Sequence, residues 1–335
     1  MKRKVAINGF GRIGRIVFNL LQENEFVEVV AINDLTSAKD LAYLLKYDSI
    51  HRLSDKYIIS SEDDYLIVND KKIKVFKELD PINLPWKELS IDYVLECTGK
   101  FTKEEEALKH IKAGAKKVIV SAPCKGNVKT IVYGVNESIL DGNESIVSAA
   151  SCTTNCLAPV LKVLNDNFKV QRGFMTTVHA YTNDQVILDV SHKKGIESRR
   201  GRAAGLNIIP TETGAANAIG KVIPELEGKL SGSAMRVPVG DGSVIDLTLE
   251  LNKKVTKEEI NNIFKENVNQ TLNYTEDPIV SSDVIGKECG ALVDGLLTNV
   301  LDTGEKQLVK VIAWYDNEVG YSSQMVRLVE YISRL

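Results

Sequence analysis

Residues 4–14 read Lys-Val-Ala-Ile-Asn-Gly-Phe-Gly-Arg-Ile-Gly, an apolar run followed by glycines at positions 9, 11 and 14. The run Val5–Ile7 predicts a buried strand, and the apolar spacing from Gly11 to Gln22 predicts a helix. Between a strand and a helix, the pattern G-x-G-x-x-G is typical of dinucleotide binding. Glycine permits the tight turn and the close approach of backbone to pyrophosphate, and the helix N-terminus offers N–H groups to phosphate.

Asp34 supports this interpretation, because it follows the second predicted strand, Val27–Ile32. A carboxylate there can accept hydrogen bonds from the ribose hydroxyls of NAD and repels the additional phosphate of NADP. The alternative is that the glycines only form a turn and that Asp34 caps the next helix. The βαβ context favours a site for NAD.

Apolar runs continue to alternate with helical patterns, which predicts a largely parallel, Rossmann-type doubly wound α/β sheet. Residues 57–75 differ, since their alternating apolar residues and the turn candidate Asn69-Asp70 predict a small antiparallel excursion. The predicted helices are 37–45 and 103–112, and the further strands are 93–96, 117–121 and 131–133.

The sequence pattern changes after Ser151, where longer β-rich runs predict a second, α+β domain with a large mixed or antiparallel sheet. These runs are 173–179, 234–239, 244–251 and 309–314, with a helix over 257–268. Residues 318–335 have the apolar spacing of a helix that docks on another element. We expect an NAD-binding domain over 1–150, joined by a C-terminal helix over 317–335, and a catalytic domain over 151–316.

Composition excludes several classes of function. The 335 residues carry 42 basic and 45 acidic side chains mixed along the chain, so we predict neither a nucleic-acid partner nor a membrane partner. The five scattered cysteines make a poor disulfide framework and suit a reducing compartment, so we expect a cytoplasmic protein. The four histidines lie far from one another in the sequence, and we expect no metal.

The segment Ser151-Cys-Thr-Thr-Asn-Cys156 follows a predicted strand and precedes the helical spacing of 157–168, so Cys152 should lie at a helix N-terminus. The helix dipole there stabilises a thiolate. His179 ends another predicted strand, and an imidazole beside Cys152 could hold the thiolate and accept a proton. Taken singly, a buried structural cysteine and a hydrogen-bonded core histidine are the default interpretations. Pro159 should bend the helix.

Arginines supply the remaining chemistry. A cluster at 199, 200 and 202, together with Arg236, can bind phosphate through planar guanidinium groups. Thr213-Gly214 opens a helical run over 215–222 and could present a hydroxyl and N–H groups to an anion. The alternative is that the cluster is a solvated loop face.

Five segments resemble those of phosphorylating glyceraldehyde-3-phosphate dehydrogenases, in the family's order over essentially the whole chain. They are Asn8-Gly-Phe-Gly-Arg-Ile-Gly-Arg15, Ser151-Cys-Thr-Thr-Asn-Cys-Leu-Ala-Pro159, Asn207-Ile-Ile-Pro210, Thr213-Gly-Ala-Ala216 and Trp314-Tyr-Asp-Asn-Glu318. The resemblance implies that Cys152 attacks glyceraldehyde 3-phosphate, that His179 takes the proton, and that hydride passes to NAD. Inorganic phosphate then cleaves the thioester to 1,3-bisphosphoglycerate.

The resemblance also assigns binding residues. It implies that Thr182, Arg200 and Arg236 hold the substrate phosphate, and that Ser151, Thr153, Thr213 and Gly214 hold the attacking phosphate. The implied cofactor residues are Gly9, Gly11, Arg12, Ile13, Asp34, Leu79, Ser121 and Asn317, with Leu79 where the family commonly has an arginine beside the adenine. A loop near 191–204, longer than usual before Arg199, and a homotetramer are further expectations. The longer loop leaves Arg199 and Arg202 as alternatives to Arg200, and the absence of a proline common near Ser191 leaves the rejection of NADP open.

Other activities compete with this one. An erythrose-4-phosphate dehydrogenase would share the nucleophile but release a free acid, and a biosynthetic acyl-phosphate reductase would run equivalent chemistry in reverse. A binding or adhesion protein could keep the fold without catalysis. The presence of Cys152, His179 and Arg236 favours an enzyme.

Overall fold

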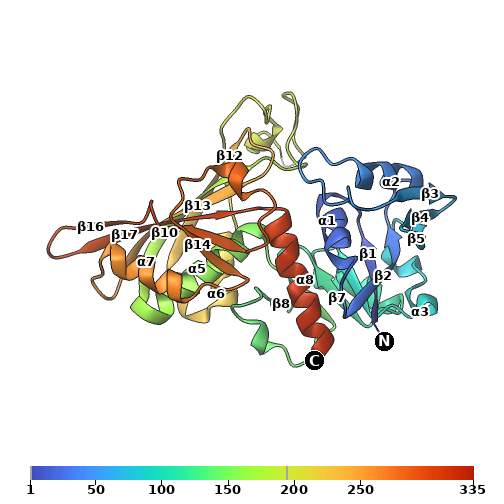
Figure 1. Cartoon of the computed structure of the whole chain (residues 1–335), viewed down its shortest axis with the longest axis horizontal. Helices are drawn as coiled ribbons and strands as arrows, with labels where there is room; N and C mark the ends of the chain where they lie inside the picture. The colour runs from blue at the N-terminus through green and yellow to red at the C-terminus, as the bar shows by residue number, and fades with distance from the viewer. Residues whose placement is uncertain (1, 194) are drawn as a thin grey trace. The chain divides into compact units, whose positions relative to one another are not determined.

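The computed structural model describes residues 2–193 and 195–335, and its contacts divide the chain into two units. The first unit comprises Met1–Ser151 and Ser322–Leu335, and the second comprises Cys152–Tyr321. Helix α8, Val319–Arg334, begins in the second unit and ends in the first (Figure 1). In the part of the chain that the structure describes, no helix combines the length and the apolar character needed to cross a bilayer.

A nine-stranded sheet forms the centre of the first unit, with the order β3-β4-β5-β2-β1-β6-β7-β9-β8. Strand β2 lies on one side of β1, and β6 and β7 lie on the other, which is the doubly wound arrangement that the sequence predicts. Its strands are β1 Arg3–Asn8, β2 Val27–Asn33, β3 Ile59–Glu62, β4 Tyr65–Val68, β5 Lys71–Phe76, β6 Tyr93–Glu96, β7 Lys117–Val120, β8 Lys129–Thr130 and β9 Ile146–Ser148. Its helices are α1 Arg12–Leu21, α2 Ala38–Lys46, α3 Trp86–Leu89 and α4 Glu104–Lys112.

The antiparallel excursion is confirmed. Strands β3, β4 and β5 pair antiparallel, and β5 then joins β2 in parallel, with Ile32 opposite Val75. Asn69 and Asp70 form the two-residue turn between β4 and β5, with φ of 47° and 67°. Positive φ at both positions suits the right-handed twist of a hairpin, and asparagine and aspartate tolerate it better than most residues.

The predicted strand over 131–133 is wrong, because β8 covers only Lys129–Thr130. Ile131 and Val132 are buried as their apolar character requires, but they are not part of the strand. The amide side chain of Asn136 donates to the carbonyl of Thr130 and accepts from the N–H of Val132. Ile131 still donates to the carbonyl of Ser148 in β9, and the side chain of Asn136 takes over the hydrogen bonds of Thr130 and Val132.

An eight-stranded mixed sheet forms the second unit, as predicted for an α+β domain. Its main path is β11-β12-β10-β13-β17-β15-β14, and β16 pairs with β17. Helices α5, α6 and α7 pack against it (Figure 1). The strands are β10 Val170–Ala180, β11 Ile209–Glu212, β12 Leu230–Val237, β13 Ser243–Leu251, β14 Leu272–Thr275, β15 Ala291–Asp294, β16 Asn299–Asp302 and β17 Gln307–Tyr315, and the helices are α5 Cys152–Phe168, α6 Ala215–Val222 and α7 Lys257–Glu266.

Candidate active site

The glycine turn after β1 admits no side chain at two of its three positions. Gly9 has a φ of +91°, and a Cβ atom there would lie 2.7 Å from the backbone nitrogen of Thr98. A Cβ on Gly14 would overlap the carbonyl oxygen of Gly9. At Gly11, in contrast, a Cβ would have no described atom within 4 Å. Two glycines therefore shape the turn, and the third leaves open space at the start of α1.

Asp34 follows β2 and links that strand to the glycine turn. Its Oδ2 accepts from the N–H of Phe10 at 2.8 Å, and its Oδ1 accepts from the N–H of Thr36 at 3.0 Å. Each oxygen keeps a second lone pair for a ligand hydroxyl. The carboxylate lines a pocket within the first unit together with Asn8, Gly9, Gly11, Asn33, Leu35, Glu78, Leu79, Cys97, Thr98, Lys100 and Phe101.

This pocket lies where the strand order reverses between β1 and β6, the usual ligand site of a doubly wound sheet. The closely packed glycine turn, the acceptor carboxylate and the mostly exposed Leu79 fit the adenosine half of NAD. The residues therefore fit a bound dinucleotide.

The other predicted cofactor residues are more scattered. Arg12 and Ile13 lie in the first turn of α1, and the guanidinium of Arg12 pairs with Asp48 at 2.5 Å. Ser121 follows β7, and its N–H donates to the carbonyl of Glu96. Asn317 belongs to the second unit, where its Oδ1 accepts from the hydroxyl of Ser243 at 2.6 Å.

Cys152 and His179 lie together in the second unit. Cys152 is the first residue of α5, and His179 is the penultimate residue of β10. Cys152 Sγ is 3.4 Å from His179 Nε2. On the other side of the ring, His179 Nδ1 is 2.7 Å from the carbonyl oxygen of Ala180. In the tautomer in which Nδ1 donates to that oxygen, the lone pair of Nε2 faces the sulfur.

The electrostatic setting differs from a simple helix N-terminus. Burial raises the pKa of the Cys152 thiol, while the charge of Arg236 and hydrogen bonds from Thr153 oppose the rise. Burial, and next the charge of Arg236, lower the pKa of His179 to about 3. The unliganded pair is thus a neutral thiol facing a neutral imidazole that can accept a proton. The helix dipole alone does not produce the expected low thiol pKa.

Arg236 lies beside His179 because strands β10 and β12 pair in parallel, with His179 opposite Arg236. Its Nη1 is 3.0 Å from His179 Nδ1, and it donates to the carbonyl of Ala180 at 2.8 Å and to Thr182 Oγ1 at 3.1 Å. Burial, and next the charge of Arg200, lower the pKa of Arg236. Two guanidinium groups that lie close enough for the charge of Arg200 to act on Arg236 form a site suited to an anion.

The structure separates the three clustered arginines. Arg200 pairs with Asp184, which also accepts from the hydroxyl of Thr182, so Arg200 joins the group around Arg236. Arg202 instead pairs with Asp189 at 2.9 Å, and Arg199 is exposed. Of the three arginines, Arg200 is thus the one connected to Thr182 and Arg236.

The residues predicted for the second phosphate lie at two helix starts. Thr153 is buried in the first turn of α5, and its hydroxyl contacts that of Tyr315 at 3.0 Å. Ser151 immediately precedes α5. Gly214 is the N-cap of α6, where Thr213 Oγ1 accepts from the N–H of Ala215, and α6 packs against α5.

Sequence reasoning missed Tyr315, although it lies in the quoted segment 314–318. Its hydroxyl contacts the hydroxyls of Thr153 and Thr177, at 3.0 and 2.8 Å. Its ring meets the ring of His179 edge to face, with centroids 5.9 Å apart. Tyr315 thereby supports the imidazole from the side.

A dinucleotide-binding doubly wound unit, joined to a unit in which a thiol faces an imidazole beside two arginines, defines the class of NAD-dependent aldehyde dehydrogenases. Comparison with known proteins narrows the class. Residues 3–104 match the family model described as glyceraldehyde 3-phosphate dehydrogenase, NAD binding domain, and residues 151–317 match the model of the C-terminal domain of the same family. The chain belongs to the glyceraldehyde-3-phosphate dehydrogenase family.

Relatives match over nearly their whole length. The chain is 57% identical to the glyceraldehyde-3-phosphate dehydrogenase of Clostridium pasteurianum and 56% identical to that of Clostridium acetobutylicum, over 99% of each chain. It is 52% identical to the enzyme of Streptococcus pyogenes, over 99% of this chain and 98% of the relative. The family membership therefore applies to both units.

Proposed function

We propose that this chain catalyses the phosphorylating oxidation of D-glyceraldehyde 3-phosphate to 1,3-bisphosphoglycerate, with reduction of NAD, as a step of glycolysis. The observation that carries the proposal is the 3.4 Å approach of Cys152 Sγ to Nε2 of His179, with Arg236 on the far side of the same ring. Similarity to named glyceraldehyde-3-phosphate dehydrogenases supplies the substrate.

The covalent step begins at Cys152. The sulfur attacks the aldehyde carbon, and His179 Nε2 takes the thiol proton and passes it to the carbonyl oxygen, which becomes the hydroxyl of a hemithioacetal while His179 returns to its neutral form. NAD supplies the acceptor for the hydride that leaves this carbon. As the hydride leaves, His179 removes the hydroxyl proton, and the product on Cys152 is a thioester. An oxygen of inorganic phosphate then attacks the thioester, and the Cys152 thiolate departs.

The substrate phosphate would also change the pKa of His179, the general base. Its negative charge beside Arg200 and Arg236 offsets the two positive charges that lower the pKa of His179. Binding therefore raises the pKa of the imidazole toward the range of an effective general base. A substrate without the phosphate would leave His179 a weak base, which favours phosphorylated aldehydes.

We assign Thr182, Arg200 and Arg236 to the substrate phosphate because hydrogen bonds already connect them through Asp184. We assign Ser151, Thr153, Thr213 and Gly214 to the attacking phosphate, supported by their positions at the starts of α5 and α6. Residues 1–150 with the C-terminal helix would bind NAD, with Asn317 at the nicotinamide amide, and residues 151–316 would carry the covalent chemistry.

The test is to follow NADH formation from glyceraldehyde 3-phosphate and NAD, with and without inorganic phosphate, and to repeat it with NADP. Reduction of NAD that requires phosphate supports the proposal. Reduction without a phosphate requirement would point to hydrolysis, as in an erythrose-4-phosphate dehydrogenase. Activity confined to aspartyl or glutamyl phosphate, or no reduction at all, would overturn the proposal.

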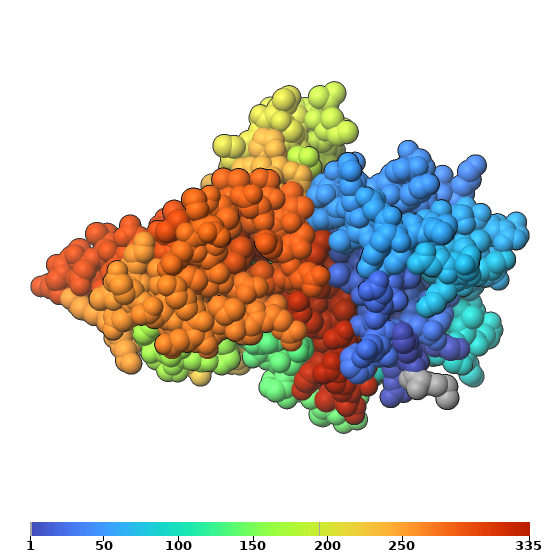
Figure 2. Space-filling view, in the orientation of Figure 1, coloured from blue at the N-terminus to red at the C-terminus, as the bar shows by residue number. Residues whose placement is uncertain are grey.

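We further propose that copies of this chain self-associate, in the homotetramer expected of the family. The segment between β10 and β11, coloured yellow-green in Figure 2, carries apolar side chains that are each more than half exposed. They are Ile187, Leu188, Val190, Ile196, Leu206 and Ile208. Such a concentration of exposed aliphatic residues is typical of a surface covered by a partner. The five free thiols support a reducing, cytoplasmic setting.

A further inference from the structure

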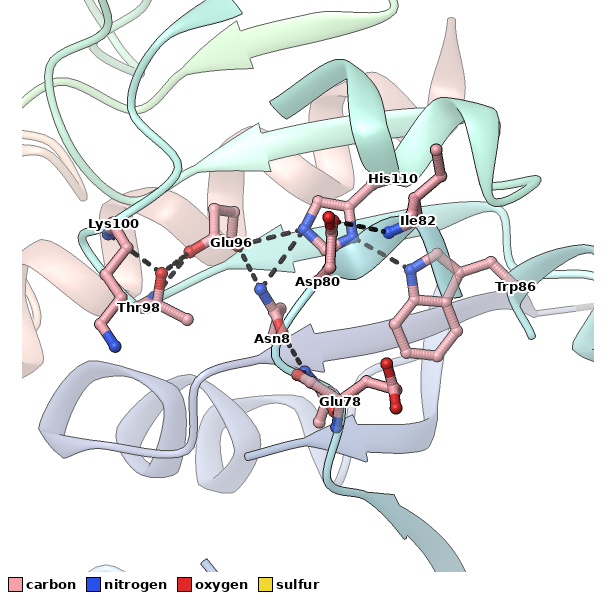
Figure 3. A network of polar contacts seen from close by, with 10 residues as sticks. Asn8, Glu78, Asp80, Ile82, Trp86, Glu96, Thr98, Lys100 and His110 are labelled. Atoms are coloured by element: carbon pink, nitrogen blue, oxygen red, sulfur yellow. Dashed lines mark hydrogen bonds and ion pairs between the residues drawn. The ribbon is translucent and has the colours of Figure 1, made fainter. Parts of the chain in front are cut away.

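A fully buried carboxylate lies beneath the adenosine pocket. Glu96 is the last residue of β6, and its side chain is 0% exposed. Its Oε1 accepts from the N–H of Thr98 at 2.8 Å and also from the hydroxyl of Thr98. Its Oε2 accepts from Asn8 Nδ2 and faces His110 Nε2 at 3.1 Å (Figure 3). Four polar contacts thus converge on one carboxylate.

The indole of Trp86 fixes the state of His110. Trp86 Nε1 can only donate, and it lies 3.0 Å from His110 Nδ1, which must therefore accept. Because Nδ1 lacks a proton, Nε2 carries it and donates to Glu96. All four partners of Glu96 are then donors, and two of them lie at each oxygen of the carboxyl group.

The second arm of the network reaches the wall of the pocket. Asn8 Oδ1 accepts from Asn33 Nδ2 at 2.7 Å, and Asn33 Nδ2 also donates to the carbonyl of Glu78 at 2.9 Å. The N–H of Glu78 donates to Asn33 Oδ1 at 2.8 Å. Since the backbone of Glu78 fixes the orientation of the Asn33 amide, it also fixes that of Asn8. From Glu78 to Trp86, each hydrogen bond of the network therefore has only one possible donor and one possible acceptor.

Asn8, Asn33 and Glu96 are the last residues of β1, β2 and β6, which are neighbours in the sheet. The network therefore connects three strand ends to the two segments that flank the pocket. One segment contains Thr98, whose backbone nitrogen packs against Gly9. The other contains Glu78 and leads to Leu79.

We propose that Glu96 is a positioning residue for the adenosine half of NAD, acting through Thr98 on one side and through Asn8 and Asn33 on the other. The carboxylate holds the glycine turn and the segment before Leu79 in the arrangement that receives the dinucleotide. The proposal rests on NAD binding by the first unit and not on the identity of the aldehyde.

The direct test is Glu96→Gln, with NAD binding measured by calorimetry in the absence of substrate and repeated with AMP. The amide NH₂ of glutamine would face two donors whichever way it turned. We expect the affinity for NAD and for AMP to fall by about tenfold or more, the cost of about one buried donor left unpaired. We expect kcat at saturating NAD to stay near that of the wild type. The control is Glu88→Gln, which removes an exposed carboxylate of α3 in the same unit.

A milder pair of variants covers the case in which Glu96→Gln does not fold. Thr98→Val keeps the shape of the side chain but removes the hydroxyl that donates to Glu96 and accepts from the N–H of Lys100. We expect weaker NAD binding with kcat retained, and we expect Thr98→Ser to restore binding. Wild-type affinity in Glu96→Gln or in Thr98→Val would overturn the proposal, as would a loss of kcat with unchanged NAD affinity.

Discussion

A single guanidinium acts on both members of the thiol–imidazole pair. Arg236 opposes the effect of burial on the Cys152 thiol, and it adds to the effect of burial on His179. Its charge thus favours the thiolate and also keeps the imidazole unprotonated. Both effects follow from the parallel pairing of β10 with β12, which places Arg236 opposite His179.

Replacing Arg236 should change the reactivity of Cys152. In Arg236→Met the positive charge is lost, so the pKa of the Cys152 thiol rises and the thiolate fraction at any pH below that pKa falls. The pH profile of alkylation by uncharged iodoacetamide, followed on the peptide that contains Cys152, should move to higher pH. Arg202→Met, which removes an exposed arginine, is the control and should leave the profile unchanged. An unshifted profile in Arg236→Met would contradict this assignment.

Replacing the nucleophile should separate chemistry from cofactor binding. A serine hydroxyl is far less acidic than a thiol, so Cys152→Ser should lower turnover by about a thousandfold or more. NAD affinity should be unchanged, because the adenosine pocket is formed by residues of the first unit. Initial rates of NADH formation and calorimetric titration with NAD measure the two effects. Near-normal turnover in this variant would exclude the covalent mechanism.

At the scale of elements, two glycines of the turn after β1 have different roles: Gly14 is needed for packing, and Gly11 is needed for NAD binding. Gly14→Ala should lower the free energy of unfolding by about 1–3 kcal/mol, because the methyl group overlaps the carbonyl of Gly9. Gly11→Ala should change that free energy by less than about 0.5 kcal/mol, because its methyl group meets no described atom within 4 Å, and yet weaken NAD binding, because Gly11 lines the pocket. Urea denaturation and NAD titration distinguish them. Equal destabilisation by the two variants would contradict this interpretation.

Local chemistry explains which elements the sequence predicts. The glycine turn, the Asn69-Asp70 hairpin turn and helix α6 each depend on residues a few positions apart, and the structure confirms all three. The strand expected over 131–133 was wrong because the side chain of Asn136 completes the hydrogen bonds there. Burial without strand pairing leaves the same apolar pattern as a strand.

Prediction of the site residues from the sequence is limited in the same way, because only some contacts join residues that lie close together in the chain. Cys152 and His179 lie in recognisable segments, and the structure places them 3.4 Å apart. Glu96 ends a short apolar strand, and its partner Asn8 is 88 residues away in the sequence. Two contacts of Glu96 come from Thr98, two residues further on, but the other two come from Asn8 and His110 on a separate strand and helix, so the sequence near Glu96 does not indicate the buried network. Only the folded sheet brings those donors together.

At the scale of the whole molecule, the exposed apolar residues between β10 and β11 predict assembly. In the double variant Leu206→Asp and Ile208→Asp, two buried charges would destabilise any interface formed by this segment. Sedimentation velocity should show a tetramer for the wild type and smaller species for the variant. Ile58→Asp, at an exposed position before β3, is the control and should leave the assembly intact. A monomeric wild type, or an unchanged variant, would contradict the proposal.

The two sheets also share the way in which they end. The outermost strands of both sheets have four residues or fewer: they are β3 and β8 in the first sheet, and β11, β14 and β16 in the second. The long strands β10, β13 and β17 lie inside the second sheet. In β11, Pro210 further removes one backbone donor. Short edge strands offer another chain few backbone groups to pair with, so edge-to-edge pairing between molecules is disfavoured even in a crowded solution. The molecule can thus expose apolar side chains between β10 and β11 while its short edge strands disfavour amyloid-like aggregation.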